Sequence, residues 1–415
     1  MADIALVAEG NMDRRDALQT MAGALAGMVA AGTTAASTAA AQSTSATAPA
    51  FTTTHVPDTE LPVNVLEYEP AAQKRISQMA YDYIAGGAGD EITLRANRSS
   101  FDRIRLMPRA LVDVSKLDTK LKLLGQEFDF PIILAPTAYH KLVHPQGELA
   151  TAAGAAAAGV TYTVSTFATT SIEKIAASTK GRLWFQLYVQ PDRYFTRDLI
   201  QKAEGLGCKA LVITVDTPVL GVRDREKRSR FNLPPGIERE NLVGLGSPAA
   251  RAHSPTESAI FSAALDPTLT WDVVSWIQSI AKVPVILKGI INPADAKRAA
   301  EQGAHAILVS NHGARNLDTS PATIEALPHC IEAVDGKIPV LMDGGVRRGT
   351  DIVKALALGA SAVLIGRPYL WALGLQGADG VQRVVNMLRT EMAAAMALCG
   401  TTSIDQIDKK VIWPY

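Results

Sequence analysis

The stretch Ser310-Asn311-His312-Gly313-Ala314-Arg315 directly follows the apolar run 305–309, whose length and composition predict a buried strand. A histidine and an arginine therefore stand just past the carboxyl end of a strand, where one can accept a proton and the other can hold an anion. Two later strands end in similar loops, at 343–349 and at Gly366-Arg367. Three consecutive strands that end in charged, glycine-rich loops predict an active site on one face of a barrel.

From residue 130 onward, short apolar runs alternate with helical segments, several of which end at glycine, as helices often do. Eight such repeats in about 240 residues predict an α/β fold, a parallel (β/α)8 TIM barrel. A doubly wound sheet is the alternative, but no Gly-x-Gly-x-x-Gly turn follows the first run. The predicted strands are Pro131–Ala135, Val160–Ser165, Leu183–Val189, Ala210–Val215, Val283–Leu287, Ala306–Val309, Val340–Met342 and Ala362–Ile365.

Two segments outside this repeat have distinct compositions. Ahead of the barrel (residues 111–415), residues 51–110 read as a linker followed by an N-terminal helical segment. Most strand starts lie roughly 22–33 residues apart, but the fourth and fifth are separated by about 73. The excess, at about 218–267, is rich in Arg, Pro, Gly and Ser, and we interpret this long insertion as a lid over the catalytic face.

The first fifty residues differ from the rest of the chain. Arg14-Arg15 precedes a weakly apolar stretch, 17–31, and a run rich in Ser, Thr and Ala that extends to residue 50. This layout is typical of a twin-arginine export signal and predicts a periplasmic location. The alternative is a low-complexity leader on a cytoplasmic protein. Residues 17–31 are too short to span a bilayer well, so no stable membrane insertion is expected.

The overall composition excludes several classes of function. The chain has 41 basic and 41 acidic residues, so no net field favours nucleic acid or an anionic membrane. Three cysteines are too few for a disulfide framework, and their spacing is not that of metal ligands. We therefore expect neither a metal site nor a nucleic-acid partner.

The residues at the carboxyl ends of the eight strands form a coherent set, because in a barrel these ends all open to one mouth. Loops after strands seven and eight commonly bind phosphate there, and glycine amides with Arg347 and Arg367 suit a doubly charged phosphate ester. The residues alone thus predict a phosphate-bearing cofactor.

Several motifs in the same order resemble the FMN-dependent L-2-hydroxy-acid oxidase/dehydrogenase family, which includes glycolate oxidase and lactate oxidase. The resemblance runs from about residue 62 to 409, and its clearest segments are 81–91, 186–188, 214–218, 310–318 and 343–349. It implies FMN as the cofactor, a small 2-hydroxy acid as the substrate and a homotetramer.

The resemblance also implies catalytic roles for three residues. His312 would be the base that faces the substrate's 2-hydroxyl group and α-carbon, Asp216 would hydrogen-bond its imidazole, and Tyr188 would lie near the hydroxyl. A histidine suits this role because its pKa lies near neutral pH. The implied substrate-binding residues are Tyr83, Tyr188, Arg223 and Arg315, of which the two arginines would bind the carboxylate.

The cofactor positions follow from the same resemblance. Lys288 would lie by the flavin ring, where a fixed positive charge favours its reduced, anionic form. The other implied FMN-binding residues are Pro136, Thr137, Ala138, Ser165, Gln186, Thr214, Ser310, Asp343, Gly344, Gly345, Arg347, Gly366 and Arg367.

The predicted reaction is oxidation of an L-2-hydroxy acid to the 2-oxo acid, with oxygen reduced to hydrogen peroxide. Ala138 beside the flavin and an insertion without a long apolar segment favour this over a periplasmic dehydrogenase that uses a quinone or cytochrome. A catalytically silent FMN-binding module is a further alternative. Tyr139-His140, Phe167 and Ile84 depart from the family pattern near the expected substrate side chain, so the size of the substrate stays open.

Overall fold

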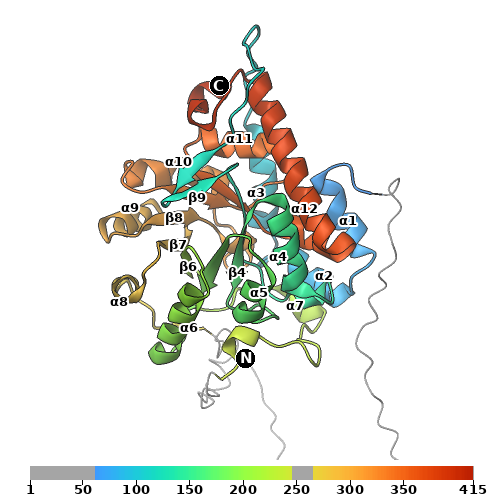
Figure 1. Ribbon diagram of the computed structural model, residues 1–415, viewed down its shortest axis with the longest axis vertical. Helices are drawn as coiled ribbons and strands as arrows, with labels where there is room; N and C mark the ends of the chain where they lie inside the picture. Colours follow the sequence, from blue (N-terminus) through green and yellow to red (C-terminus); the bar gives the residue numbers. More distant parts are fainter. Residues whose placement is uncertain (1–60, 245–264, 415) are drawn as a thin grey trace, which may run out of the picture. The chain divides into compact units, whose positions relative to one another are not determined.

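Eight parallel strands form a closed barrel in this computed structural model, in the ring order β10-β3-β4-β5-β6-β7-β8-β9 (Figure 1). The structure describes residues 61–244 and 265–414. The predicted (β/α)8 barrel is confirmed. Its strands are β3 (Ile132–Leu134), β4 (Thr161–Ser165), β5 (Leu183–Leu187), β6 (Leu211–Thr214), β7 (Val285–Ile290), β8 (Ala306–Val309), β9 (Val340–Asp343) and β10 (Ala362–Ile365).

Strand β7 differs from its prediction, which ended the strand at residue 287. The strand continues to Ile290, and its register against β8 shifts between Lys288 and Ile290. Gly289 takes a left-handed φ of 107° at this irregularity, and a Cβ there would lie 2.4 Å from the Cβ of Asp216. Glycine is therefore required at this position for Asp216 to approach the strand.

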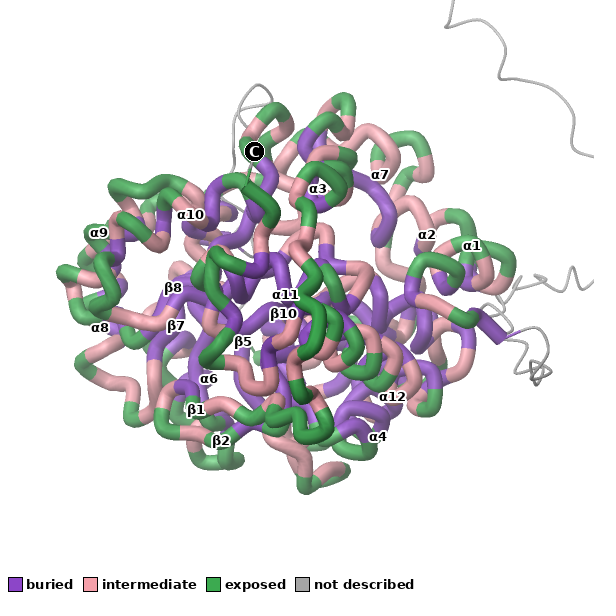
Figure 2. The backbone as a smooth tube through the Cα atoms, turned by 90° about the horizontal axis from the view of Figure 1, so that it is seen from above, coloured by how far each residue is buried: buried purple, intermediate pink, exposed green. Residues whose placement is uncertain are grey.

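Helices cover the outside of the barrel, and the strands inside them are buried along their length (Figure 2). This follows from the sequence, since parallel strands buried on both faces are continuous apolar runs and each helix buries one apolar stripe. The helices are α4 (Gly147–Ala158), α5 (Ile172–Ser178), α6 (Arg193–Gly205), α8 (Asp272–Ile280), α9 (Pro293–Glu301), α10 (Thr323–Val334), α11 (Gly349–Ala357) and α12 (Arg367–Leu398).

The predicted N-terminal helical segment is present ahead of the barrel. It comprises a 3-10 turn (Val65–Glu67) and the helices α1 (Tyr68–Gln73), α2 (Gln78–Ala85) and α3 (Ile92–Arg103). Helix α1 packs against α12, and α3 packs against α10. Helices α2 and α3 also reach the carboxyl end of the barrel. There α2 contacts the insertion, and α3 contacts the turn after β8.

A short hairpin at the opposite end was not predicted. Strands β1 (Leu121–Leu123) and β2 (Gln126–Phe128) pair antiparallel, and Leu123 and Phe128 pack with the side chains that fill the barrel. Trp184 of β5 donates its indole N–H to Gln126 at 3.2 Å. The hairpin therefore covers the amino ends of the strands and leaves the carboxyl ends as the open mouth.

The insertion between β6 and β7 lies where the strand spacing predicted it. Its described part contains helix α7 (Asp224–Arg228) and a 3-10 turn (Glu240–Leu242). Its role as a lid stays a prediction, and the predicted export signal in the first fifty residues lies outside the described residues. No helix within the described ranges combines the length and the apolar character needed to cross a bilayer.

The contact between α4 and α12 depends on Gly154, where a Cβ would lie 2.3 Å from the carbonyl oxygen of Ala378. We expect Gly154→Ala to lower the free energy of unfolding by about 1–3 kcal/mol, because overpacking forces the helices apart. Denaturant unfolding measures the change. Gly205→Ala is the control, since nothing lies within 4 Å of its added Cβ. Equal stability of the two variants would contradict close helix packing here.

Candidate active site

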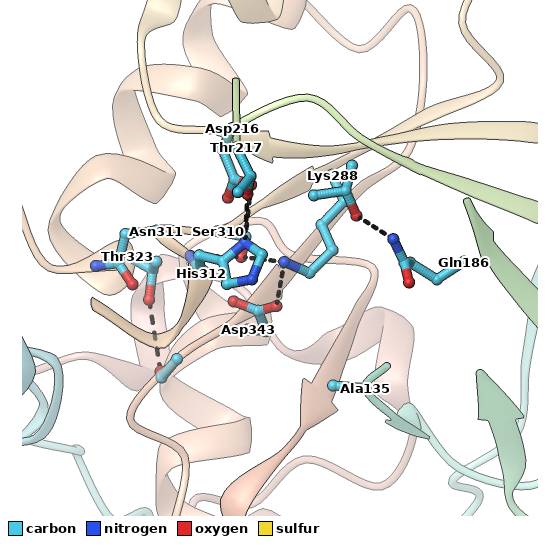
Figure 3. A network of polar contacts seen from close by, with 12 residues as sticks. Ala135, Gln186, Asp216, Thr217, Lys288, Ser310, Asn311, His312, Thr323 and Asp343 are labelled. Atoms are coloured by element: carbon cyan, nitrogen blue, oxygen red, sulfur yellow. Dashed lines mark hydrogen bonds and ion pairs between the residues drawn. The ribbon is translucent and has the colours of Figure 1, made fainter. Parts of the chain in front are cut away.

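His312 lies on the tight turn that follows β8, and its imidazole is held from one side (Figure 3). Its Nδ1 is 2.8 Å from Oδ1 of Asp216 and 3.2 Å from Oγ1 of Thr217, which itself donates to the same carboxylate at 2.9 Å. Asn316 donates to the carbonyl oxygen of Asp216 and to Oγ1 of Thr217 at 2.7 and 2.9 Å. The imidazole is therefore fixed through Nδ1, and Nε2 faces the cavity.

Burial sets the protonation of this pair. Burial lowers the pKa of His312 to about 4, although Asp216 acts in the opposite direction. Burial alone would raise the pKa of Asp216, but His312 and Lys288 together lower it to about 2. At neutral pH, a neutral imidazole thus donates its Nδ1 hydrogen to a carboxylate. The lone pair of Nε2 remains, and the hydroxyl of Tyr188 lies 3.3 Å from it.

The turn that carries His312 has three successive residues in left-handed conformations, with φ of 58° at His312, 63° at Gly313 and 62° at Ala314. Such values cost about 1–2 kcal/mol per non-glycine residue. Asn311 offsets this cost, because its Oδ1 accepts from the backbone N–H of Ala314 at 3.1 Å. A buried, reciprocal amide pair with Asn97 of α3 holds the Asn311 side chain in turn.

Two arginines converge on one carboxylate beside this base. Arg315 Nη2 is 2.7 Å from Oε1 of Glu226 on α7, and Arg223 Nη1 is 3.5 Å from the same oxygen. The guanidinium of Arg315 also lies 4.7 Å from the centre of the Tyr83 ring. Two cations and one anion leave an excess of one positive charge, which suits one further carboxylate.

A layer of hydrogen-bonded polar groups lies deeper in the mouth (Figure 3). Lys288 Nζ donates to Oγ of Ser310 at 3.1 Å and lies 3.8 Å from a carboxylate oxygen of Asp343. Burial raises the pKa of Asp343, and its Oδ1 has no hydrogen-bond partner among the described residues. Gln186 links Ser165 to Thr214 at 3.0 and 2.9 Å.

Arg347 and Arg367 occupy the side of the mouth after β9 and β10. Burial and the neighbouring Arg315 and Arg347 lower the pKa of Arg367 to about 9, and burial lowers that of Arg347. Within residues 61–244 and 265–414, Arg367 donates only to the carbonyl oxygens of Ile84 and Gly86, and no carboxylate lies within 4.0 Å of either guanidinium. Two partly buried cations without an anion are costly, so an external dianion is expected here.

One cavity of about 300 Å³ unites these groups. Ser310 and Asp216 do not line it, and they contact Lys288 and His312 from behind. All other predicted site residues line it, namely Tyr83, Pro136, Thr137, Ala138, Ser165, Gln186, Tyr188, Thr214, Arg223, Lys288, His312, Arg315, Asp343, Gly344, Gly345, Arg347, Gly366 and Arg367.

Comparison with known proteins gives the family. Residues 72–414 match the model of the FMN-dependent dehydrogenases. The chain is 50% identical over 357 residues to L-lactate oxidase of Nostoc sp., covering 84% of this chain and 97% of that protein. This chain belongs to the FMN-dependent 2-hydroxy-acid oxidase family.

Other members of the family agree in sequence and in structure. Glycolate oxidase 3 of Arabidopsis thaliana is 47% identical over 347 residues, which cover 83% of this chain and 94% of that protein. A crystal structure of mandelate oxidase with (S)-2-phenylpropionate superposes with a TM-score of 0.76 at 40% identity. That match covers 85% of this chain and 98% of the mandelate oxidase.

Proteins of this family depend on FMN, and the mouth of the barrel fits that cofactor. The unpaired guanidinium groups of Arg347 and Arg367 would hold the phosphate, since they need a dianion. The unpartnered Oδ1 of Asp343 would accept a hydroxyl hydrogen from the ribityl chain. Lys288 would supply positive charge at the flavin ring.

Several residues of the site were not predicted from sequence. Thr217 hydrogen-bonds both His312 and Asp216, and its position directly after Asp216 was the available signal. Glu226 lies three residues after Arg223, the spacing of an ion pair on a helix. Asn97 and Arg239 have no local signal, because the chain folds back over long separations to bring them to the site.

One of the four positions that depart from the family pattern lies behind the cavity wall. His140 does not face the cavity but is buried behind Thr137, whose Oγ1 lies 2.7 Å from its Nε2, and its Nδ1 lies 2.9 Å from Oγ1 of Thr151. Burial lowers its pKa, so it is a neutral structural histidine. The other departures from the family pattern, Tyr139, Phe167 and Ile84, do line the cavity.

We expect Arg347→Leu to weaken FMN binding by roughly 10- to 150-fold, since a hydrogen bond to a charged group contributes about 1.5–3 kcal/mol. Fluorescence titration of the deflavinated protein with FMN measures the dissociation constant. Arg228→Leu, which alters an exposed arginine of the insertion outside the cavity, is the control and should bind FMN like the wild type. Equal FMN affinity in the Arg347 variant and the control would exclude the phosphate role.

We expect Asp216→Asn to slow anaerobic flavin reduction by roughly 10³–10⁴-fold, because the amide no longer selects the tautomer with hydrogen on Nδ1. Stopped-flow spectroscopy measures the rate. The control is Asp224→Asn, which removes a carboxylate from the outer side of the insertion. A wild-type rate in the Asp216 variant would show that the carboxylate does not orient His312.

The pH dependence of flavin reduction follows from the lowered pKa of His312. The base acts unprotonated, so protonation below its folded pKa removes it. We therefore expect a constant rate between about pH 6 and pH 8, with loss only as the pH falls toward about 4. Stopped-flow measurements across this range test the profile. A decline centred near pH 6.5, the pKa of a free imidazole, would contradict burial as the dominant effect.

Proposed function

We propose that this protein oxidises an L-2-hydroxy acid to the 2-oxo acid and passes the electrons to oxygen, which becomes hydrogen peroxide. The observation that carries the proposal is the juxtaposition of an unprotonated Nε2 on His312 with the arginine pair Arg223 and Arg315 in one cavity. Such a site can hold a carboxylate and remove a proton from the adjacent carbon or its hydroxyl group.

The chain's residues divide the work between binding and proton transfer. Arg223 and Arg315 bind the substrate carboxylate, and the guanidinium of Arg315 lies over the ring of Tyr83. Burial raises the pKa of both Tyr83 and Tyr188, so both phenols stay protonated and act as hydrogen-bond donors. Tyr188 lies beside Nε2 of His312 and orients the 2-hydroxyl group toward it.

His312 takes the proton at Nε2 and becomes an imidazolium. Asp216 stabilises that charge directly, because its carboxylate is 2.8 Å from Nδ1 and stays ionised. Bound FMN supplies the acceptor for the two electrons that leave the substrate. The walls of Tyr83, Phe167 and Tyr188 limit water around the base.

Anaerobic mixing of the yellow holoenzyme with L-lactate, glycolate and (S)-mandelate tests the reaction. We expect at least one acid to bleach the flavin, and His312→Gln to retain FMN but reduce it roughly 10²–10⁴-fold more slowly. His329→Gln, which alters an exposed histidine on α10, is the control. If no 2-hydroxy acid bleaches the flavin, the oxidase proposal fails and the protein is instead a catalytically silent FMN-binding module.

The second half of the reaction is tested by adding oxygen to the reduced enzyme. We expect fast reoxidation in air, with one hydrogen peroxide formed for each 2-oxo acid. Peroxide is measured with a peroxidase-coupled dye. Slow reoxidation in air together with rapid reoxidation by a quinone analogue would make the protein a dehydrogenase instead.

A further inference from the structure

Arg239 is a cation in the same cavity that neither the carboxylate-binding pair nor the phosphate side uses. It lies on the insertion, and its Nε donates to the hydroxyl of Tyr139 at 2.7 Å. Its guanidinium carbon is 4.7 Å from the centre of the Phe167 ring and 5.8 Å from that of Tyr139. The two aromatic side chains therefore fix the guanidinium at the cavity wall.

The charge of Arg239 is not compensated by the protein residues that the structure describes. Within residues 61–244 and 265–414, no carboxylate lies within 4.0 Å of it, whereas Arg223 and Arg315 share Glu226. Within those ranges the only hydrogen bond of its side chain to protein is the one from Nε. The Nη groups are thus available to an acceptor that enters the cavity.

The position of this cation relative to the base is defined by two pairs of neighbouring aromatic rings, each tilted rather than stacked. Phe167, under the guanidinium, lies 4.6 Å from Tyr188 between ring centres, and the Tyr188 hydroxyl reaches Nε2 of His312. On the other side, the ring centre of Tyr139 lies 5.5 Å from that of Tyr83, and the guanidinium of Arg315 lies over the Tyr83 ring. Two aromatic rings therefore separate Arg239 from the base, and two separate it from Arg315.

We propose that Arg239 binds a second carboxylate, so that the preferred substrates are L-2-hydroxy dicarboxylic acids. This rests on the proposed function, because the first carboxylate must occupy Arg223 and Arg315 while His312 faces the hydroxyl group. A guanidinium held by its Nε offers both Nη groups to a carboxylate as a fork. Tyr139 and Phe167, which depart from the family pattern, are the residues that position it.

The overall reaction is unchanged by the second carboxylate. One α-carbon–hydrogen bond and one hydroxyl oxygen–hydrogen bond break, and the carbon–oxygen bond becomes a carbonyl. Two electrons and two protons leave the hydroxy diacid, and one oxygen molecule takes them to become hydrogen peroxide. The distal carboxylate takes no part in bond making and contributes binding and orientation.

The experiment compares anaerobic reduction of the holoenzyme by L-lactate, L-malate and L-2-hydroxyglutarate. We expect the ratio of reduction rate constant to dissociation constant to be higher for at least one diacid than for L-lactate. Arg239→Leu should lower the diacid-to-lactate ratio roughly 10- to 150-fold, the effect of one charge-assisted pair. Arg239→Lys should restore part of it, since it keeps the charge without the fork. Arg228→Leu is the matched control on the same insertion.

The outcomes separate this inference from the proposed function. Reduction by L-lactate but by neither diacid would overturn the role of Arg239 and leave the oxidase intact. An equal loss toward lactate and the diacids in Arg239→Leu would make Arg239 a residue that only closes the cavity, and would overturn the inference too. If no hydroxy acid reduces the flavin, the proposed function fails, and the inference fails with it.

Discussion

The cost of burying charge governs the arrangement at the carboxyl end of the barrel. An ion moved from water into a protein interior loses several kcal/mol of solvation unless a partner compensates it. Asp216 accepts hydrogen bonds from His312 and Thr217, and Lys288 lies 3.8 Å from Asp343. Arg347 and Arg367 have no such partner among the described residues, and their lowered pKa values express that cost. A cofactor phosphate bound between Arg347 and Arg367 would therefore stabilise this end of the fold.

The turn after β8 at the same end of the barrel has a strained backbone, and this backbone positions the imidazole of His312. The left-handed backbone at His312 and Ala314 is unfavourable on its own, and it persists because Asn311 and Asn97 form a closed amide pair beneath it. The carbonyl oxygen of Ala314 also accepts from the backbone N–H of Ala88, in the loop after α2. Contacts from α3 and from the loop after α2 thus hold the turn that carries His312 in its left-handed conformation. This explains why these helices pack at the mouth of the barrel.

The sequence predicted the barrel well because buried parallel strands and glycine-ended helices leave strong local patterns. It failed where a local pattern misled or was missing. Lys288 and Gly289 read as a strand end, yet β7 continues through them because Asp343 and Ser310 compensate the buried lysine. The hairpin at 121–128 turns through Leu124 and Gly125, with left-handed φ of 52° and 70°. Gly125 was the available turn signal, but leucine at the first turn position is not a residue type that marks turns.

The site residues also differ in whether a local sequence pattern marks them. Those at strand ends could be predicted, since a closed parallel barrel brings all carboxyl ends to one mouth. Glu226, Arg239 and Asn97 could not, because their roles depend on how the insertion and α3 fold over that mouth. Asp216 and Ser310 were predicted as part of the site, but only the structure shows that they support His312 and Lys288 from behind.

The electrostatics of the base and of the carboxylate-binding pair are coupled. Positive charge on Arg223 and Lys288 opposes protonation of His312, and Asp216 favours it. In the proposed reaction, a substrate carboxylate bound by Arg223 and Arg315 would neutralise their excess positive charge, which would weaken one of the effects that keep the imidazole neutral. His312 would then be a stronger base with substrate bound than without it. The anion held by the arginines would in this way also prepare the proton acceptor that acts on it.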